Sequence, residues 1–392
     1  MKKSLIALAA LAAVGVASAQ SSVTMFGVVD MAYGAHKTSS RDGTVFTKTG
    51  GVMDGSNAGS RIGFRGTEDL GGGLRASFHL EQGISPTQPE GYDVRVGSGA
   101  HQVIGNGTHT TGNNRQTFLG LAGGFGEVRI GYQYTNSYAL VAFTGLNPSE
   151  FQGGNYQNAS HANGGRANVI TYIAPTMSGI TLTAQAGGGT GRGTVESNSV
   201  AATSGNGFTK NNNKYMSLSA LYKAGNLTVG AAYSKADLTQ ENAVGATITN
   251  AFGVASAAAA AANTRINRSP KALHIVGGYN FGMARVAATI TDASNDGSFT
   301  SATASKTKAQ QLALWVPFGA AEAWVSTGKS KVTPTGGAAT TDQEGTAFGV
   351  RYNLSKRTTA YAFSGTDKNS ALTGATASYK DTKTAVGVAH SF

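Results

Sequence analysis

Single arginines, each set among alternating apolar side chains, are the residues of this sequence best suited to chemistry. In residues 60–66, Ile62 and Phe64 point to one side of an extended chain, and Arg61 and Arg65 point to the other. A guanidinium keeps its positive charge at any ordinary pH and binds carboxylates and phosphates. The sequence therefore predicts a polar, cationic face that attracts anions. In addition to Arg61, the arginines expected on this face are Arg65, Arg75, Arg129, Arg285 and Arg351.

Catalytic chemistry has little support in the sequence. The seven histidines are dispersed, and none belongs to an HExxH motif. The glycine-rich run at 187–191 lacks the following helix and the Lys-Ser/Thr pair of a phosphate-binding loop. We therefore expect no enzymatic activity, no metal and no cofactor. The net charge of +11 is spread over scattered residues, which argues against a nucleic-acid partner.

The first 19 residues have the pattern of a cleaved signal peptide. Lys2 and Lys3 precede an apolar core at 5–16, and Ala17-Ser18-Ala19 is a small-residue cleavage site. We expect residues 20–392 to form one exported domain. This part has no cysteine and no apolar run of about 20 residues for a membrane-spanning helix. It is expected to be soluble outside the cytoplasm or to span a membrane as strands.

Period-two alternation recurs along the whole mature chain. The final stretch, Thr382 to Phe392, is one such strand, and it needs a partner because an unpaired edge invites aggregation. The first strand, Val23 to Tyr33, can supply that partner by closing a barrel. Seven strand pairs joined by short turns, with the first and last strands, make 16 strands. Short turns then alternate with long polar connections, as in bacterial outer-membrane barrels.

The physics of a bilayer favours the transmembrane barrel over a soluble all-β domain. Every backbone polar group in lipid must be paired within the protein, so open sheets cannot span. A barrel of about 16 strands is too wide for side chains to fill, which predicts a water channel. One segment, Ala251 to Asn263, departs from the pattern, because its alanine content favours a short loop helix or a mobile insertion.

Five segments carry a resemblance to a known family. They are SSVTMFGVVDMAYG (21–34), SRIGFRGTEDLGGGLRASFHLEQG (60–83), NRQTFLGLAGGFGEVRIGYQYT (114–135), RANVITYIAP (166–175) and VGVAHSF (386–392). On these segments the chain resembles the trimeric 16-stranded general porins of Gram-negative outer membranes, in particular the β-proteobacterial type. The resemblance implies a homotrimer in outer-membrane lipid, a third external loop folded into the lumen, and passive diffusion of small hydrophilic solutes.

The resemblance also implies a constriction in which wall arginines face the third loop. By motif position the arginines are Arg61, Arg115 and Arg166, and the loop (136–165) contributes its single acid, Glu150. The alternation of Arg61 with Ile62 and Phe64 places its side chain on the inward face. Arg115 and Arg166 begin strands on the outward side, so a bulge or a loop conformation must turn them inward. The chain has Gly131-Tyr132-Gln133 where family members often have Gly-Arg-Gln, which removes one basic wall residue.

Several functions remain open at this level. An anion-leaning general diffusion channel is the first. A substrate-specific channel for sugars or organic anions needs a row of aromatic side chains along the lumen. Trp315 and Trp324 are candidates for such a row. A surface adhesin or receptor can act through the external loops. Phe392 is expected from the resemblance to serve as the signal that the barrel-assembly machinery reads, or to be a plain interfacial anchor.

Overall fold

The computed structural model of the chain describes residues 22–40, 45–54, 57–87, 115–143, 165–189, 194–200, 206–242, 248–249, 255–256, 264–295, 304–334, 340–371 and 379–392. The expected signal peptide at 1–19 and the expected third-loop acid Glu150 lie outside these residues, and both stay predictions.

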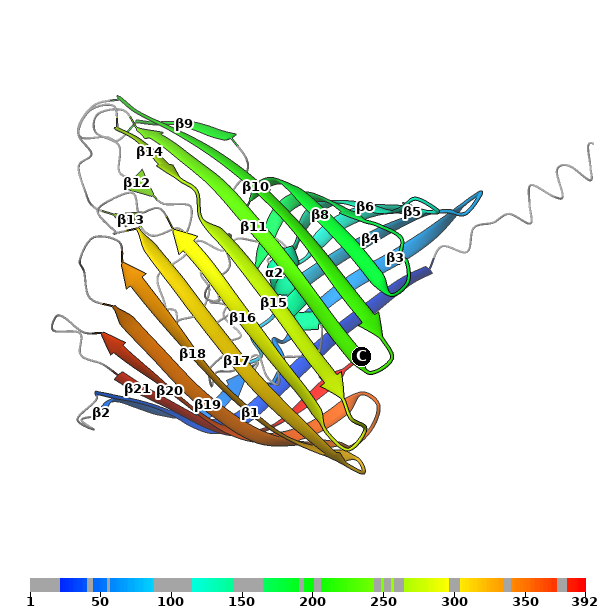
Figure 1. Cartoon of the computed structure of the whole chain (residues 1–392), viewed down its shortest axis with the longest axis vertical. Helices are drawn as coiled ribbons and strands as arrows, with labels where there is room; N and C mark the ends of the chain where they lie inside the picture. The colour runs from blue at the N-terminus through cyan, green and yellow to red at the C-terminus, as the bar shows by residue number, and fades with distance from the viewer. Residues whose placement is uncertain are drawn as a thin grey trace, which may run out of the picture.

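Sixteen of the described strands form a closed antiparallel barrel (Figure 1). Each pairs with the next, and the last pairs with the first. The all-β, 16-stranded prediction is thereby confirmed. The wall strands are β1 (Ser22–Ser40), β3 (Arg61–Gly71), β4 (Leu74–Gly83), β5 (Thr117–Gly123), β6 (Gly126–Tyr134), β7 (Arg166–Ile173), β8 (Ile180–Gly189), β10 (Asn206–Ala224), β11 (Leu227–Asn242), β15 (Lys271–Asn280), β16 (Arg285–Asn295), β17 (Ser305–Phe318), β18 (Ala321–Pro334), β19 (Thr341–Asn353), β20 (Thr358–Ala371) and β21 (Tyr379–Ser391).

The first and last strands seal the barrel as expected. The register of β1 against β21 runs from Val28 opposite Ser391 to Ser40 opposite Tyr379. Beyond it, Phe392 and Gly27 exchange two backbone hydrogen bonds of 3.1 Å each. The closure satisfies the edge groups that an open sheet would expose.

Three further strands lengthen the wall on one side. β2 (Val45–Asp54), β9 (Thr194–Val200) and β14 (Thr264–Arg268) pair with β1, β10 and β11 respectively. Separately, β12 (Ile248–Thr249) pairs with β13 (Ala255–Ser256). The expected loop helix at 251–263 is therefore wrong for Ala255 and Ser256, which pair as a strand, and the rest of that segment lies outside the described residues.

Strand β1 changes its neighbour from β3 to β2 around Asp30, and this carboxylate holds the junction. Asp30 is fully buried, and its Oδ2 accepts the backbone N–H groups of Asn57 and Ala58 at 2.6 Å each. The Tyr361 hydroxyl donates to Oδ1 at 2.5 Å. The carboxylate thus supplies hydrogen-bond partners to a segment that leaves the regular ladder.

The two faces of the wall have opposite chemistry. On β17, Leu312 is exposed on the outside while Gln311 is buried on the inside. On β18, Val325 is exposed on the outside while Ser326 is buried on the inside. This is the inverse of a water-soluble domain and suits a barrel whose outer surface contacts lipid. In the described part of the chain, helices are too short or too polar to span a membrane.

The chain turns inward directly after β6. Helix α2 (Asn136–Phe143) contacts the inner faces of β8, β10, β11 and β15. The Asn136 N–H donates to Gln185 Oε1 at 2.9 Å, and the Ser137 hydroxyl donates to Ser234 Oγ at 3.3 Å. Leu140 and Val141 join the buried apolar cluster of the wall. The third long connection thus enters the lumen, as predicted, over its described part.

Candidate functional site

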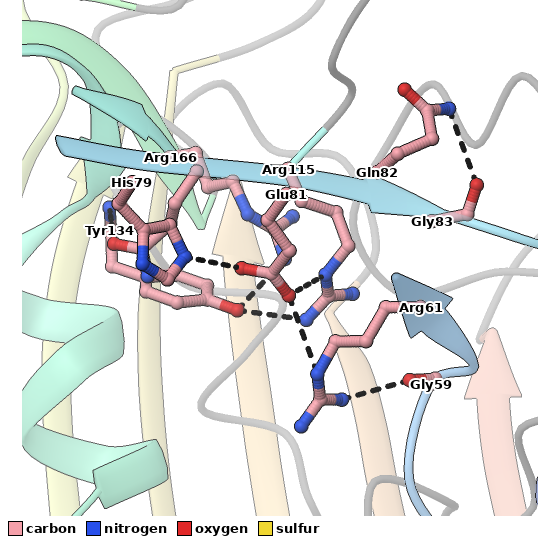
Figure 2. Close-up of polar contacts among 10 residues, drawn as sticks. Gly59, Arg61, His79, Glu81, Gln82, Gly83, Arg115, Tyr134 and Arg166 are labelled. Atoms are coloured by element: carbon pink, nitrogen blue, oxygen red, sulfur yellow. Dashed lines mark hydrogen bonds and ion pairs between the residues drawn. The ribbon is translucent and has the colours of Figure 1, made fainter. Parts of the chain in front are cut away.

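A buried carboxylate, Glu81 on β4, lies at the centre of a cationic cluster on the inner wall (Figure 2). Its Oε1 accepts from Arg115 Nε at 2.5 Å and lies 3.3 Å from Arg61 Nε. Its Oε2 lies 3.3 Å from His79 Nε2. One carboxylate therefore neutralises only part of the charge that the arginines bring to it.

Tyr134 at the end of β6 joins a third arginine to this cluster. Its hydroxyl accepts from Arg115 Nη2 at 2.9 Å and from Arg166 Nη2 at 3.1 Å. The Arg166 guanidinium also lies 4.6 Å from the centroid of the Tyr134 ring, in a cation–π contact. The Tyr134 ring stacks on Tyr138 of α2 at 4.8 Å, so the cluster is continuous with the in-folded helix.

The positions of the three arginines in their elements explain how they meet. Arg61 opens β3 beside β4, and its Nη1 donates to the Gly59 carbonyl at 2.8 Å. Arg115 lies before the first residue of β5, where strand alternation does not yet apply. Arg166 is the first residue of β7 and lies opposite Tyr134 in the register. All three occupy the ends of strands, where the backbone can aim a side chain inward.

The predicted residues Arg61, Arg115 and Arg166 thus lie together, and their role as a constriction stays a prediction. The sequence-based choice of site residues omitted three members of the cluster, Glu81, His79 and Tyr134. Glu81 and His79 share the inward face of Arg75, and this alternation was a usable signal. Tyr134 shares the parity of outward Val128 and Ile130. Gly131, with φ of 141°, marks an irregularity three residues before it, since such a backbone favours glycine.

The remaining predicted lining arginines lie on inward strand positions but outside the cluster. Arg129 forms two hydrogen bonds with Glu127, at 2.7 and 2.8 Å, and lies over the Phe118 ring. Arg65 lies over the Phe26 ring at 5.3 Å, and Arg75 is exposed. Acidic partners therefore reduce the effective charge of the wall below a simple count of arginines.

A second group of inward charges lies on β16, β18 and β19. Glu322 Oε2 is 3.7 Å from Arg285 Nη2, and its Oε1 is 4.0 Å from Arg351 Nη1. The Arg285 guanidinium lies 4.4 Å from the centroid of Trp315. Two arginines again share one carboxylate. In the described ranges there is no group of three or more His, Asp or Glu side chains arranged for a metal ion.

Comparison with known proteins places the chain in a family. Residues 6–372 match the family described as Gram-negative porin, and the chain belongs to this family of outer-membrane channel proteins. Outer membrane porin protein 32 of Delftia acidovorans is 40% identical over 191 residues, which are 46% of this chain and 47% of that protein. Major outer membrane protein P.IB of Neisseria lactamica is 38% identical over 156 residues, covering 39% and 38%. The matches span less than half the length of these relatives.

Solved structures extend the likeness to the whole barrel. The anion-selective porin from Comamonas acidovorans has a TM-score of 0.62 at 25% identity, covering 95% of this chain and 100% of that one. OmpT of Vibrio cholerae has a TM-score of 0.60 at 14% identity, covering 96% and 99%, and supports the fold alone. The expected porin family and the outer-membrane location are confirmed.

Proposed function

We propose that this protein is a general diffusion porin that passes ions and small hydrophilic solutes and prefers anions. The convergence of Arg61, Arg115 and Arg166 around one carboxylate carries this proposal. Rings of like charge in a narrow pore raise the local concentration of the opposite ion. The likeness to a porin described as anion-selective supports the same sign of preference.

The charge balance along the inner wall supports an anion preference. Three arginines share Glu81 through ion pairs or through Tyr134, and Arg285 and Arg351 share Glu322. Each group keeps an excess of positive charge. Because the two groups lie on different strands of the barrel, an anion meets favourable potential at more than one place.

A sugar-specific channel has less support. Such a channel needs aromatic rings presented to the solute, yet Trp315 is 1% exposed and Trp324 is 5% exposed. Gly349 leaves room for the Trp324 ring to lie flat on the wall, since a Cβ there would come within 2.8 Å of it. Both rings therefore serve the packing of the wall.

The proposal includes three assignments that rest on the family resemblance. The chain forms a homotrimer, Glu150 faces the arginine cluster from the third loop, and Phe392 is read by the barrel-assembly machinery. The protein has no enzymatic activity under this proposal. Adhesion through the external loops would be a secondary role.

The test is ion selectivity in planar bilayers. The native channel should pass chloride better than potassium, and Arg61→Glu should shift the reversal potential toward cations. Reversing one charge at a distance of about 8 Å in water changes the energy of a passing anion by about 1 kcal/mol, or roughly fivefold in permeability ratio.

Arg75→Glu is the matched control for this experiment. It makes the same charge change on an exposed inward position beside a short turn, away from the cluster. Potassium preference in the native channel would refute the anion assignment. An equal shift in both variants would show that Arg61 has no special position in the pore.

A further inference from the structure

A row of neighbouring rings crosses the inner wall beside the cationic cluster. We define the aromatic row as Phe26 of β1, His79 of β4 and Phe118 of β5. The centroid of the His79 ring lies 5.1 Å from that of Phe26 and 5.2 Å from that of Phe118, and the planes of His79 and Phe118 differ by 2°. All three side chains occupy inward positions and are partly exposed. The inner wall therefore offers aromatic surface to the lumen as well as arginines.

Strand register and one glycine build the aromatic row. His79 lies directly opposite Phe118 on the neighbouring strand. Phe26 is farther away, because β3 lies between β1 and β4, and its opposite residue on β3 is Gly63. A Cβ at Gly63 would come within 2.5 Å of Phe26 Cζ. The missing side chain thus lets the Phe26 ring lie across β3 and reach His79.

A guanidinium lies over each phenylalanine of the row. Arg65 Cζ is 5.3 Å from the centroid of Phe26, and Arg129 Cζ is 4.9 Å from the centroid of Phe118. A cation favours the face of a ring, because the face is the negative part of the ring quadrupole and the edge is the positive part. The imidazole and the two guanidiniums cover much of the phenyl faces. A solute in the lumen therefore meets mainly the positive ring edges of the row.

The aromatic row is continuous with the cationic cluster. His79 Nε2 lies 3.3 Å from Glu81 Oε2 (Figure 2). Glu81 in turn pairs with Arg61 and Arg115, whose combined charge exceeds its own. His79 and Glu81 are consecutive inward residues of β4, so they lie roughly 7 Å apart along the strand. Ring edges and excess guanidinium charge thus lie within reach of one small solute.

We propose that the aromatic row and the arginines beside it form a subsite for aromatic carboxylates that pass through the pore. This inference rests on the proposed function as an anion-preferring channel. The carboxylate would lie beside Arg61 and Arg115, and the negative face of the aryl ring would lie against the positive edges of the row, as in edge-to-face ring pairs. An aliphatic carboxylate has no such ring face. An uncharged sugar would make no use of the arginines.

The test measures how solutes block the chloride current through the purified, folded full-length protein in planar bilayers. The probes are benzoate and cyclohexanecarboxylate, which are both anions of similar size at neutral pH, and the uncharged benzamide. Benzoate should block saturably, at a concentration roughly fivefold lower than cyclohexanecarboxylate, from the usual strength of an aromatic pair. Benzamide should block far more weakly. Simple burial predicts the opposite order for the two anions, because the cyclohexyl group is the more apolar.

Phe118→Leu removes one ring of the row and keeps an apolar side chain there. It should abolish the preference for benzoate, so that the two anions block at similar concentrations. Phe26→Leu is a second variant with the same expected result, and it replaces Phe118→Leu if that protein forms no channels. Phe64→Leu is the matched control, because Phe64 is exposed on the outward face of β3, and it should keep the native preference.

Equal block by benzoate and cyclohexanecarboxylate in the native channel overturns the proposal. A preference for benzoate that survives the loss of the Phe118 or Phe26 ring does so too, as does its loss in Phe64→Leu. The reversal potential distinguishes this failure from failure of the proposed function. A native channel that prefers chloride but does not discriminate between the two carboxylates lacks only the subsite, whereas potassium preference overturns both.

Discussion

Glu81 gathers cations that would otherwise repel one another. Arg61, Arg115 and His79 all approach its two oxygens within 3.3 Å. A buried carboxylate is stable only when it is paired and hydrogen-bonded, and Glu81 meets both conditions. Its negative charge also opposes the positive potential of the arginines, so Glu81 limits the field that they create.

Glu81→Gln should therefore increase the anion preference and decrease stability. The remaining guanidiniums lose a counter-charge, which strengthens the field on a passing anion and leaves partly buried cations without a partner. The reversal potential in a salt gradient measures the first effect, and thermal unfolding of the folded barrel measures the second.

Glu127→Gln is the matched control, because Glu127 neutralises one arginine, Arg129, beside a short turn. It should give the smaller shift in reversal potential. If Glu81→Gln lowers the anion preference, the cluster does not set the field in the pore.

At the scale of the strand, inward glycines let large rings lie flat against the wall. A Cβ at Gly387 would come within 2.5 Å of the Tyr361 hydroxyl and 2.6 Å of the Met31 carbonyl. Tyr361 in turn donates to Asp30, which holds the junction of β1 with β2 and β3. The absence of one side chain on β21 thus permits a hydrogen bond that organises β1.

Gly387→Ala should destabilise the barrel by about 1–3 kcal/mol, the usual cost of overpacking, because a fixed carbonyl obstructs the new methyl group. Gly277→Ala serves as the control, since nothing lies within 4 Å of a Cβ built there. Urea unfolding followed by circular dichroism measures both. Similar unfolding midpoints for the two variants would show that the wall accommodates the new methyl group at position 387 without loss of stability.

At the scale of the whole barrel, Phe392 extends the closure of β21 on β1. Phe392 makes two backbone hydrogen bonds with Gly27, and its ring lies over the space that a side chain at Gly27 would need. The Ser391 N–H also donates to the Arg357 carbonyl of the neighbouring short turn at 2.8 Å. The C-terminus therefore joins the first strand to the last at the short-turn end.

Deletion of Phe392 should lower the yield of folded protein in the outer membrane more than the conductance of each assembled channel. The two hydrogen bonds between Phe392 and Gly27 are lost, and under the proposed role so is the assembly signal. Membrane fractionation gives the yield and bilayer recording the conductance. Phe392→Tyr, which keeps the aromatic ring, should assemble normally; native yield after the deletion would contradict both roles.

The sequence by itself determined the barrel, its 16 strands and its closing pair. Alternation of apolar and polar side chains is a local property, and lipid permits only one solution for paired strands. It also showed the inward parity of Arg61, Arg285 and Arg351. The sequence did not decide whether Val28 and Asp30 point into the barrel or away from it, because both faces of the first strand carry apolar residues.

The family resemblance grouped Arg61, Arg115 and Arg166, and only the tertiary structure decided which partners these side chains meet. Glu81, Tyr134 and Arg166 lie on three different strands, and Arg115 lies just before a fourth. Arg115, Tyr134 and Arg166 lie at or just before strand ends, where alternation no longer predicts direction. Cross-strand register likewise sets Lys308 of β17 beside Lys331 of β18. Local pattern governs the face of a residue within a strand, whereas neighbours across strands follow from how the closed wall is assembled.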